Sequence, residues 1–249
     1  MQELAGTEDV IIACERKEVE AMIEHSDGHL PRRRTVWVPR AVGKRRYRKG
    51  LNRFFKSKKA LKGYDQVISI GAAIEIRAAP KSSQRIYITD TEVNQLAHKL
   101  ARNKATDIVI PTHFREDLCG PLLKTKARIH RIEGLHGHVH LRPSLRPKSV
   151  SIPPRILLRR LKGGGVHDGN ELKTIPDDWL SSFEITTADE DDFTGDPWSL
   201  DSLIASMDGV ITQSTTLASE AVLLGVPTLL VSNAQRGFLD ALAKSKLLI

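Results

Sequence analysis

Residues 207–232 constrain the fold of this chain most, because their pattern changes from strand to turn to helix to strand within one short segment. Residues 210–211 are typical of a short buried strand, and apolar residues then recur at helical spacing over 217–224. Gly225 favours the end of that helix, and 228–231 predict a second buried strand. Two buried strands joined by one helix imply a parallel pair. The sequence therefore predicts an α/β fold, in which ligands bind beyond the carboxyl ends of the strands.

The turn before this predicted helix carries the groups that point to a ligand. Ser214, Thr215 and Thr216 place three hydroxyls beside the amides of a helix N-terminus, where amide donors and the helix dipole favour a phosphate. Glu220 follows Thr216 by one turn and faces the same side. A carboxylate there can accept two hydrogen bonds from a ribose diol, so the pattern predicts a nucleotide site. The alternative is that Ser214 is an ordinary N-cap and Glu220 a solvated helix residue.

Residues 213–227, Gln-Ser-Thr-Thr-Leu-Ala-Ser-Glu-Ala-Val-Leu-Leu-Gly-Val-Pro, resemble the donor-site segment of GT-B glycosyltransferases and UDP-N-acetylglucosamine 2-epimerases. More narrowly, they are similar to the archaeal and bacterial family called domain of unknown function 354. Further segments resemble that family in the same order, at 89–92, 108–111, 133–136, 167–168 and 236–239. The resemblance implies two Rossmann-like domains in GT-B style, with Gln213 among the donor-site residues. It also implies a chain that lacks the family's first strand and helix and its last helix.

The domain boundary is expected near residue 150. Prolines cluster without periodicity at 142–154, which is typical of a linker between domains. We therefore expect an acceptor-side domain over 1–148 and a nucleotide-sugar-binding domain over 149–249. With 249 residues, of which 40% are hydrophobic, the chain can bury a core in each.

Cysteine usage and the N-terminus predict a cytoplasmic protein. Cys14 and Cys119 lie far apart and outside any Cys-x-x-Cys pattern, so neither a disulfide framework nor a structural zinc site is indicated. The first residues lack the basic and apolar regions of a signal peptide, and no stretch approaches the ~20 apolar residues of a membrane span.

Residues 28–64 form a basic segment that contains fourteen Lys and Arg and no Asp or Glu, in a chain of net charge +8. They predict an amphipathic helix, whose apolar stripe comprises Tyr47, Leu51, Phe54, Phe55 and Leu61. Three interpretations remain open: a solvated face, docking on an anionic membrane at its inner face, and contact with nucleic acid. The chain shows no RNA-recognition signature, Gly-x-x-Gly clamp or zinc finger, which argues against the third.

A glycine-rich loop at 163–165 precedes His167 and Asp168. Asp168 stands where the dinucleotide fingerprint Gly-x-Gly-x-x-Gly requires its last glycine, which argues against an NAD enzyme. If the loop lines a cleft, His167 is a candidate acid or base held by Asp168. The alternative is a surface turn with ordinary polar residues.

Two acidic residues, Asp90 and Glu92, follow a predicted strand at 85–89 and precede a predicted helix at 93–102. At the carboxyl end of a strand they would face the cleft, where one could deprotonate an acceptor hydroxyl. The favoured alternative is that Asp90 caps the helix and Glu92 interacts with its dipole.

Two further clusters are expected to have no catalytic role. The residues His136, His138 and His140 alternate, so a strand would place them on one face at a spacing that could hold a metal. No carboxylate accompanies them closely, and chance alternation is the favoured interpretation. The acidic run 189–192 lacks the glycine and terminal Glu of a calcium loop and is expected to be solvated.

The predicted function is transfer of a glycosyl group from a nucleotide-sugar, with UDP as the expected nucleotide, to an unknown acceptor, for which a lipid-linked molecule is one candidate. The GT-B resemblance implies no obligatory metal and no cofactor beyond the nucleotide-sugar, because the helix dipole and hydroxyls stabilise the leaving group. One alternative is a non-hydrolysing sugar-nucleotide epimerase. The other is a non-enzymatic basic module that binds nucleic acid or anionic lipid.

Overall fold

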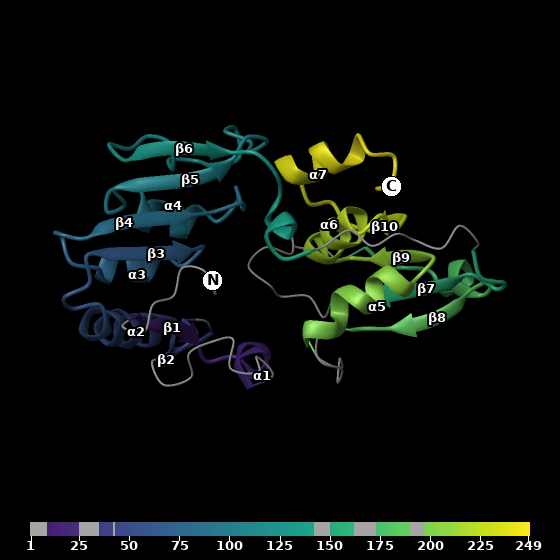
Figure 1. Ribbon diagram of the computed structural model, residues 1–249, viewed down its shortest axis with the longest axis horizontal. Helices are drawn as coiled ribbons and strands as arrows, with labels where there is room; N and C mark the ends of the chain where they lie inside the picture. The colour runs from purple at the N-terminus through teal and green to yellow at the C-terminus, as the bar shows by residue number, and fades with distance from the viewer. Residues whose placement is uncertain (1–8, 25–34, 42, 142–149, 162–172, 190–196) are drawn as a thin grey trace. The chain divides into compact units, whose positions relative to one another are not determined.

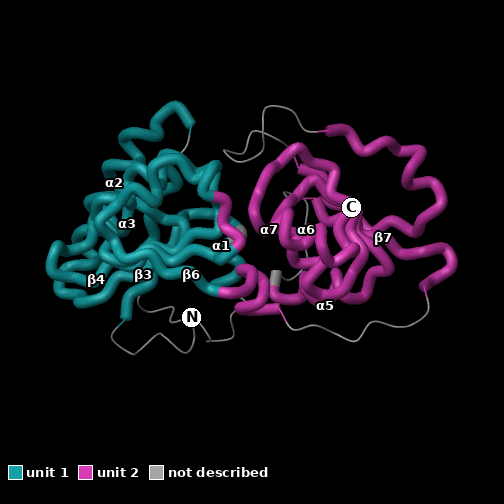
Figure 2. The backbone as a smooth tube through the Cα atoms, turned by 90° about the horizontal axis from the view of Figure 1, so that it is seen from above, with its two compact units in different colours: residues 1–112, 116–132 teal, residues 113–115, 133–249 magenta. Residues whose placement is uncertain are grey.

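The protein has an α/β fold with parallel, Rossmann-like sheets. The computed structural model describes residues 9–24, 35–41, 43–141, 150–161, 173–189 and 197–249. The chain divides into two compact units (Figure 2), which comprise 1–112 with 116–132 (unit 1) and 113–115 with 133–249 (unit 2). The units divide before Glu133, earlier than the boundary expected at 148/149, and residues 142–149 lie outside the described part.

Unit 1 contains a four-stranded parallel sheet in the order β3-β4-β5-β6 and a separate parallel pair, β1-β2 (Figure 1). Its elements are β1 (Ile11–Cys14), α1 (Lys17–Glu24), β2 (Thr35–Val38), α2 (Arg46–Ala60), β3 (Gln66–Ile70), α3 (Ala73–Ala78), β4 (Gln84–Ile88), α4 (Gln95–Ala101), β5 (Asp107–Pro111) and β6 (Arg128–Ile132). Helix α3 packs on β3, β4 and α4, and α2 packs on α3 and β2.

The sheet of unit 1 is covered unequally on its two faces. In β3, Val67 and Ser69 are buried, whereas Ile68 and Ile70, which alternate with them, are exposed. This alternation follows from the two-residue period of a strand, which sends neighbouring side chains to opposite faces. One face of β3 therefore faces the helices, and the other is accessible with apolar side chains.

Within the basic segment, Arg46–Ala60 form the predicted helix, α2. Most of the helix's apolar stripe points outward. Tyr47, Leu51 and Phe55 have relative exposures of 76%, 60% and 62%. Leu61, which follows the helix, is buried, and so is Ser57 on the inner side. The helix therefore uses a mixed polar and apolar face for packing and leaves an apolar strip open among its cations.

Unit 2 contains a four-stranded parallel sheet in the order β10-β9-β7-β8. Its elements are η2 (His136–Val139), β7 (Arg155–Arg159), η3 (Asp177–Leu180), β8 (Glu184–Thr187), η4 (Pro197–Ser199), α5 (Leu200–Ser206), β9 (Gly209–Thr212), α6 (Thr215–Leu223), β10 (Thr228–Leu230) and α7 (Gly237–Ala243). The predicted strand-helix-strand segment is confirmed as β9, α6 and the parallel strand β10. Gly225, with φ of 80°, follows the C-terminus of α6 as expected.

Strand order in unit 2 marks the position at which ligands usually bind in parallel α/β sheets. Strand β8 lies on one side of β7, and the chain then crosses to place β9 on the other side. Because the connections leave β7 and β9 in opposite directions, their carboxyl ends form a topological switch point. Buried side chains of β7, β9 and α6, among them Leu157, Val210 and Ala221, share one core cluster beneath this edge.

Candidate functional site

The candidate site lies within unit 2, at the carboxyl ends of β7 and β9. Arg159 is the last residue of β7 and Thr212 the last of β9, and the strands pair here in register. The buried Thr212 hydroxyl accepts a hydrogen bond from the Ser214 amide at 2.9 Å. This bond turns the chain sharply from β9 into α6, so that the helix begins directly above the switch point.

The three hydroxyls at the start of α6 have different roles. Ser214 is the N-cap, and its Oγ accepts from the Leu217 amide at 3.3 Å, which confirms the capping interpretation for this residue. Thr215 is half-buried and Thr216 is exposed. Their amides belong to the first turn, where helix geometry supplies no intrahelical acceptor. Within the described residues, these two hydroxyls and two amides have no hydrogen-bond partner, so they can donate to an anion at this N-terminus.

Gln213 is buried, and both polar ends of its side chain bind backbone groups of unit 2. Its Oε1 accepts from the Leu161 amide at 2.7 Å, and its Nε2 donates to the Lys173 carbonyl at 2.6 Å. Both ends of the amide are thus used to join the chain after β7, and the irregular segment before η3, to the end of β9. The structure thus shows a positioning role for Gln213, and its expected donor-site role stays a prediction.

Glu220 faces the same side of α6 as Thr216, as its spacing predicts, and its side chain is 21% exposed. Its Oε1 lies 3.7 Å from Nε2 of His140. Burial raises the pKa of Glu220, although the charges of His140, His136 and Arg159 oppose this. A carboxylate with a raised pKa between potential cations is typical of binding and catalytic sites.

Arg159 is a candidate that the sequence analysis did not single out. Its Nε is buried and has no hydrogen-bond partner within the described residues. Its charge acts on Glu220 across the switch point. The sequence does contain a signal for Arg159, because this cation directly follows the buried residues 156–158 of β7. The carboxyl ends of parallel strands face the ligand side of a sheet.

The three histidines do not alternate along a strand. Residues 136–139 form a 3-10 helix, η2, which packs on α6. The rings of His136 and His140 lie 5.8 Å apart on its α6 side, whereas His138 Nδ1 accepts from the Leu135 amide. Gly137 permits this close approach, because a Cβ there would lie 2.5 Å from Cδ1 of Leu223. No group of three or more His, Cys, Asp or Glu suited to a metal occurs in the described part of the chain.

The environment of Asp90 and Glu92 in unit 1 differs from the predicted one, in which Asp90 caps the following helix. Helix α4 is capped by Asn94, whose side chain accepts from the Ala97 amide, so the expected cap at Asp90 is wrong. Asp90 instead accepts from the Thr91 hydroxyl at 3.2 Å and is half-buried. Glu92 is fully buried and acts electrostatically on His98, whose pKa is lowered mainly by burial. Of the two, Asp90 is the one accessible at the end of β4.

Other predicted positions add nothing to this cluster. His167 and Asp168 lie outside the described residues. In the acidic run, Asp189 accepts from the Arg160 amide at 2.8 Å, and 190–192 are outside the described part. None of the described helices combines the length and apolar character required to cross a bilayer. In comparisons with known proteins, the chain matches no protein-family model and no curated protein.

Proposed function

We propose that this chain is a glycosyltransferase-like protein whose unit 2 binds a nucleotide-sugar, with UDP as the preferred nucleotide. Glu220, half-buried beside Arg159 at the switch point of the sheet, is the observation that carries the proposal. In this proposal the two units form a GT-B style pair, and unit 1 presents the acceptor. Asp90, at the end of β4, is then the candidate base for the acceptor hydroxyl.

The phosphate end of the ligand is supported by the start of α6. The amides and hydroxyls of Thr215 and Thr216 can donate to diphosphate oxygens, and the helix dipole favours negative charge there. Arg159 supplies a guanidinium whose Nε has no partner in the described residues. Together these donors would stabilise the nucleoside diphosphate as it leaves the sugar, which is the main task in glycosyl transfer.

The ribose end is supported by Glu220 one turn along α6. Its carboxylate can accept hydrogen bonds from both hydroxyls of a ribose diol. His140, 3.7 Å away, can hold the carboxylate in place and donate to the same sugar. A site built on such hydrogen bonds discriminates strongly against a ligand that lacks one hydroxyl, because the site's polar group is then left unpaired.

Binding is tested by thermal unfolding with UDP, UDP-N-acetylglucosamine, 2′-deoxy-UDP and an RNA oligomer. A ligand at 100 times its dissociation constant should stabilise the protein by about 2.7 kcal/mol. We expect UDP to stabilise the wild type more than 2′-deoxy-UDP does. The variant Glu220→Ala should lose this difference, whereas Glu184→Ala, which removes an exposed carboxylate from β8 of the same unit, should keep it.

The contact between Arg159 and the phosphates is tested by comparing the binding of UDP and uridine. Arg159→Ala should weaken UDP binding and leave the weaker binding of uridine unchanged. Equal stabilisation of all variants by UDP, or stabilisation by RNA alone, would contradict the proposal and favour a non-enzymatic basic module. Product analysis with a UDP-sugar that binds then separates the glycosyltransferase from the epimerase. Release of free UDP indicates transfer, and a UDP-sugar with inverted configuration at one sugar carbon indicates epimerisation.

The outward strip of α2 supports a second property, attachment to an anionic membrane surface. Tyr47, Leu51 and Phe55 are exposed on one side of a helix whose other exposed positions are mostly Lys and Arg. Amphipathic helices of this composition bind in the interface plane, with apolar side chains inserted and cations near the headgroups. This location would suit a transferase with a lipid-linked acceptor.

A further inference from the structure

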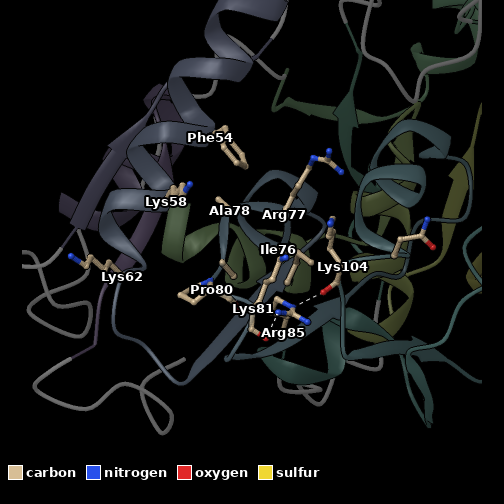
Figure 3. A pocket seen from close by; sticks show the side chains of 12 residues that line it. Phe54, Lys58, Lys62, Ile76, Arg77, Ala78, Pro80, Lys81, Arg85 and Lys104 are labelled. Atoms are coloured by element: carbon tan, nitrogen blue, oxygen red, sulfur yellow. Dashed lines mark hydrogen bonds between the residues drawn. The ribbon is translucent and has the colours of Figure 1, made fainter.

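A pocket in unit 1 is lined by cations from four separate segments (Figure 3). Its volume is about 720 Å³, within the range of ~300–1,000 Å³ that is usual for small-molecule sites. The charged lining residues are Lys58 and Lys62 from α2 and its end, Arg77 and Lys81 from α3 and the turn after it, Arg85 from β4, and Lys104 before β5. No Asp or Glu is among its lining residues as the structure describes them.

The pocket opens at the edge of the sheet opposite to the expected ligand side. Arg85 lies near the beginning of β4, and Lys104 precedes the beginning of β5. In parallel α/β sheets, substrates bind beyond the carboxyl ends of the strands. This pocket is therefore a site separate from the proposed acceptor position at Asp90, which follows the carboxyl end of β4.

Arg85 organises the floor of the pocket. Its Nε donates to the Lys104 carbonyl at 2.5 Å, and its Nη1 donates to the carbonyls of Pro80 and Lys81 at 2.9 and 2.8 Å. One guanidinium thus satisfies three backbone carbonyls in the turns after α3 and α4, and these carbonyls would otherwise disfavour an anion. The remaining cations of the lining are not needed for those carbonyls.

The other cations are available to a ligand. The side chains of Lys58, Arg77 and Lys104 are exposed, and none has a carboxylate within 4.0 Å among the described residues. Like charges gathered in a concave surface focus a positive potential, which raises the local concentration of anions. Phe54 and Ile76 add an apolar wall, which suits a ligand with a carbon framework between its charges.

We propose that this pocket binds a ligand that carries clustered phosphate groups. Lysine and arginine are the common phosphate-binding side chains, and several of them converging without acids favour more than one phosphate. A free polyphosphorylated molecule and a phosphorylated lipid headgroup share this chemistry. The apolar strip of α2 runs toward Lys58, so a headgroup could be reached from a membrane on which that helix lies.

The experiment uses two probes and one pair of matched variants of the full chain. Tripolyphosphate is titrated by calorimetry, and vesicles of phosphatidylcholine with phosphatidylinositol bisphosphate are tested by co-sedimentation. Lys58→Ala removes a cation from the pocket, and Lys59→Ala removes one from the next position of the same helix, outside the pocket. Both positions are exposed, so the variants have equal net charge and little reason to differ in folding. Thermal unfolding confirms that they fold alike.

Loss of one charged contact should weaken binding by about tenfold. We expect Lys58→Ala to show this loss and Lys59→Ala to change binding by less than about twofold. If the loss is seen with tripolyphosphate, the ligand is a free anion; if it is seen with vesicles alone, the ligand is a lipid headgroup. Equal weakening by both variants would mean general charge attraction, and that result, or no saturable binding of either probe, would overturn the proposal.

Discussion

Arg53 of α2 holds Glu75 of α3 through two parallel hydrogen bonds, from Nε to Oε1 at 2.7 Å and from Nη2 to Oε2 at 2.8 Å. The side chains are 16% and 7% exposed. Ser57 adds a third donor to the same carboxylate at 3.1 Å. One cation of the basic segment therefore has a structural role, because it joins α2 to α3.

Arg53→Ala should lower the free energy of unfolding by about 3–5 kcal/mol, because it leaves the buried Glu75 carboxylate without its cation. Urea denaturation measures this change. Arg48→Ala, at an exposed position of the same helix, is the control and should change stability by less than about 0.5 kcal/mol. Similar losses in the two variants would contradict a structural role for Arg53.

The sequence predicts the fold best where local periodicity and burial agree. The segment from β9 to β10 was predicted in type, order and parallel pairing, because β9 is buried along its whole length, β10 is apolar and half-buried, and Gly225 marks the end of α6. The structure of the histidine-containing stretch was harder to predict. Alternation at 136–140 resembles a strand, but Gly137 lets this stretch tighten into η2 against Leu223, a contact that depends on a distant part of the chain.

The candidate site was predictable only in the part that lies on one helix. Thr216 and Glu220 share a face of α6 because of helical spacing alone. Arg159 and His140 join them through strand order and helix packing, which no local pattern encodes. Gln213 resembled a donor-site residue, yet the structure uses both ends of its amide for backbone groups. The cation-lined pocket of unit 1 likewise depends on segments that are separate in sequence.

Glu220→Gln should stabilise the protein near pH 7 and have little effect near pH 4. Burial raises the folded-state pKa of Glu220, so the folded protein holds this proton more tightly than the unfolded chain does. The stability gained from the proton is present below the unfolded pKa of about 4.3 and is lost as the pH rises through the folded pKa. Thermal unfolding of both proteins between these pH values measures the difference, and a difference that does not depend on pH would contradict it.

Asp107 should contribute stability that disappears in acid. Burial alone would raise its pKa, but hydrogen bonds from His130, Thr106, Arg128 and Gln84 outweigh burial and hold the pKa well below its usual range. Stability from this carboxylate is therefore present above the unfolded pKa of about 3.9 and is lost as the pH falls toward the folded pKa. Asp107→Asn should cost about 2 kcal/mol at pH 7 and flatten the acid limb of the stability curve. Asp65→Asn, at an exposed position, should leave that limb unchanged.

The outward strip of α2 should determine binding to anionic vesicles. A double variant, Leu51→Ser with Phe55→Ser, removes two exposed apolar side chains, each worth about 1.5–3 kcal/mol when fully buried in an apolar phase. We expect it to reduce co-sedimentation with phosphatidylserine vesicles by at least about tenfold, while Leu96→Ser, at an exposed position of α4, changes it little. Neither position of the double variant is in the protein core, so its unfolding temperature should stay near that of the wild type. Unchanged sedimentation would show that the strip does not enter the bilayer interface.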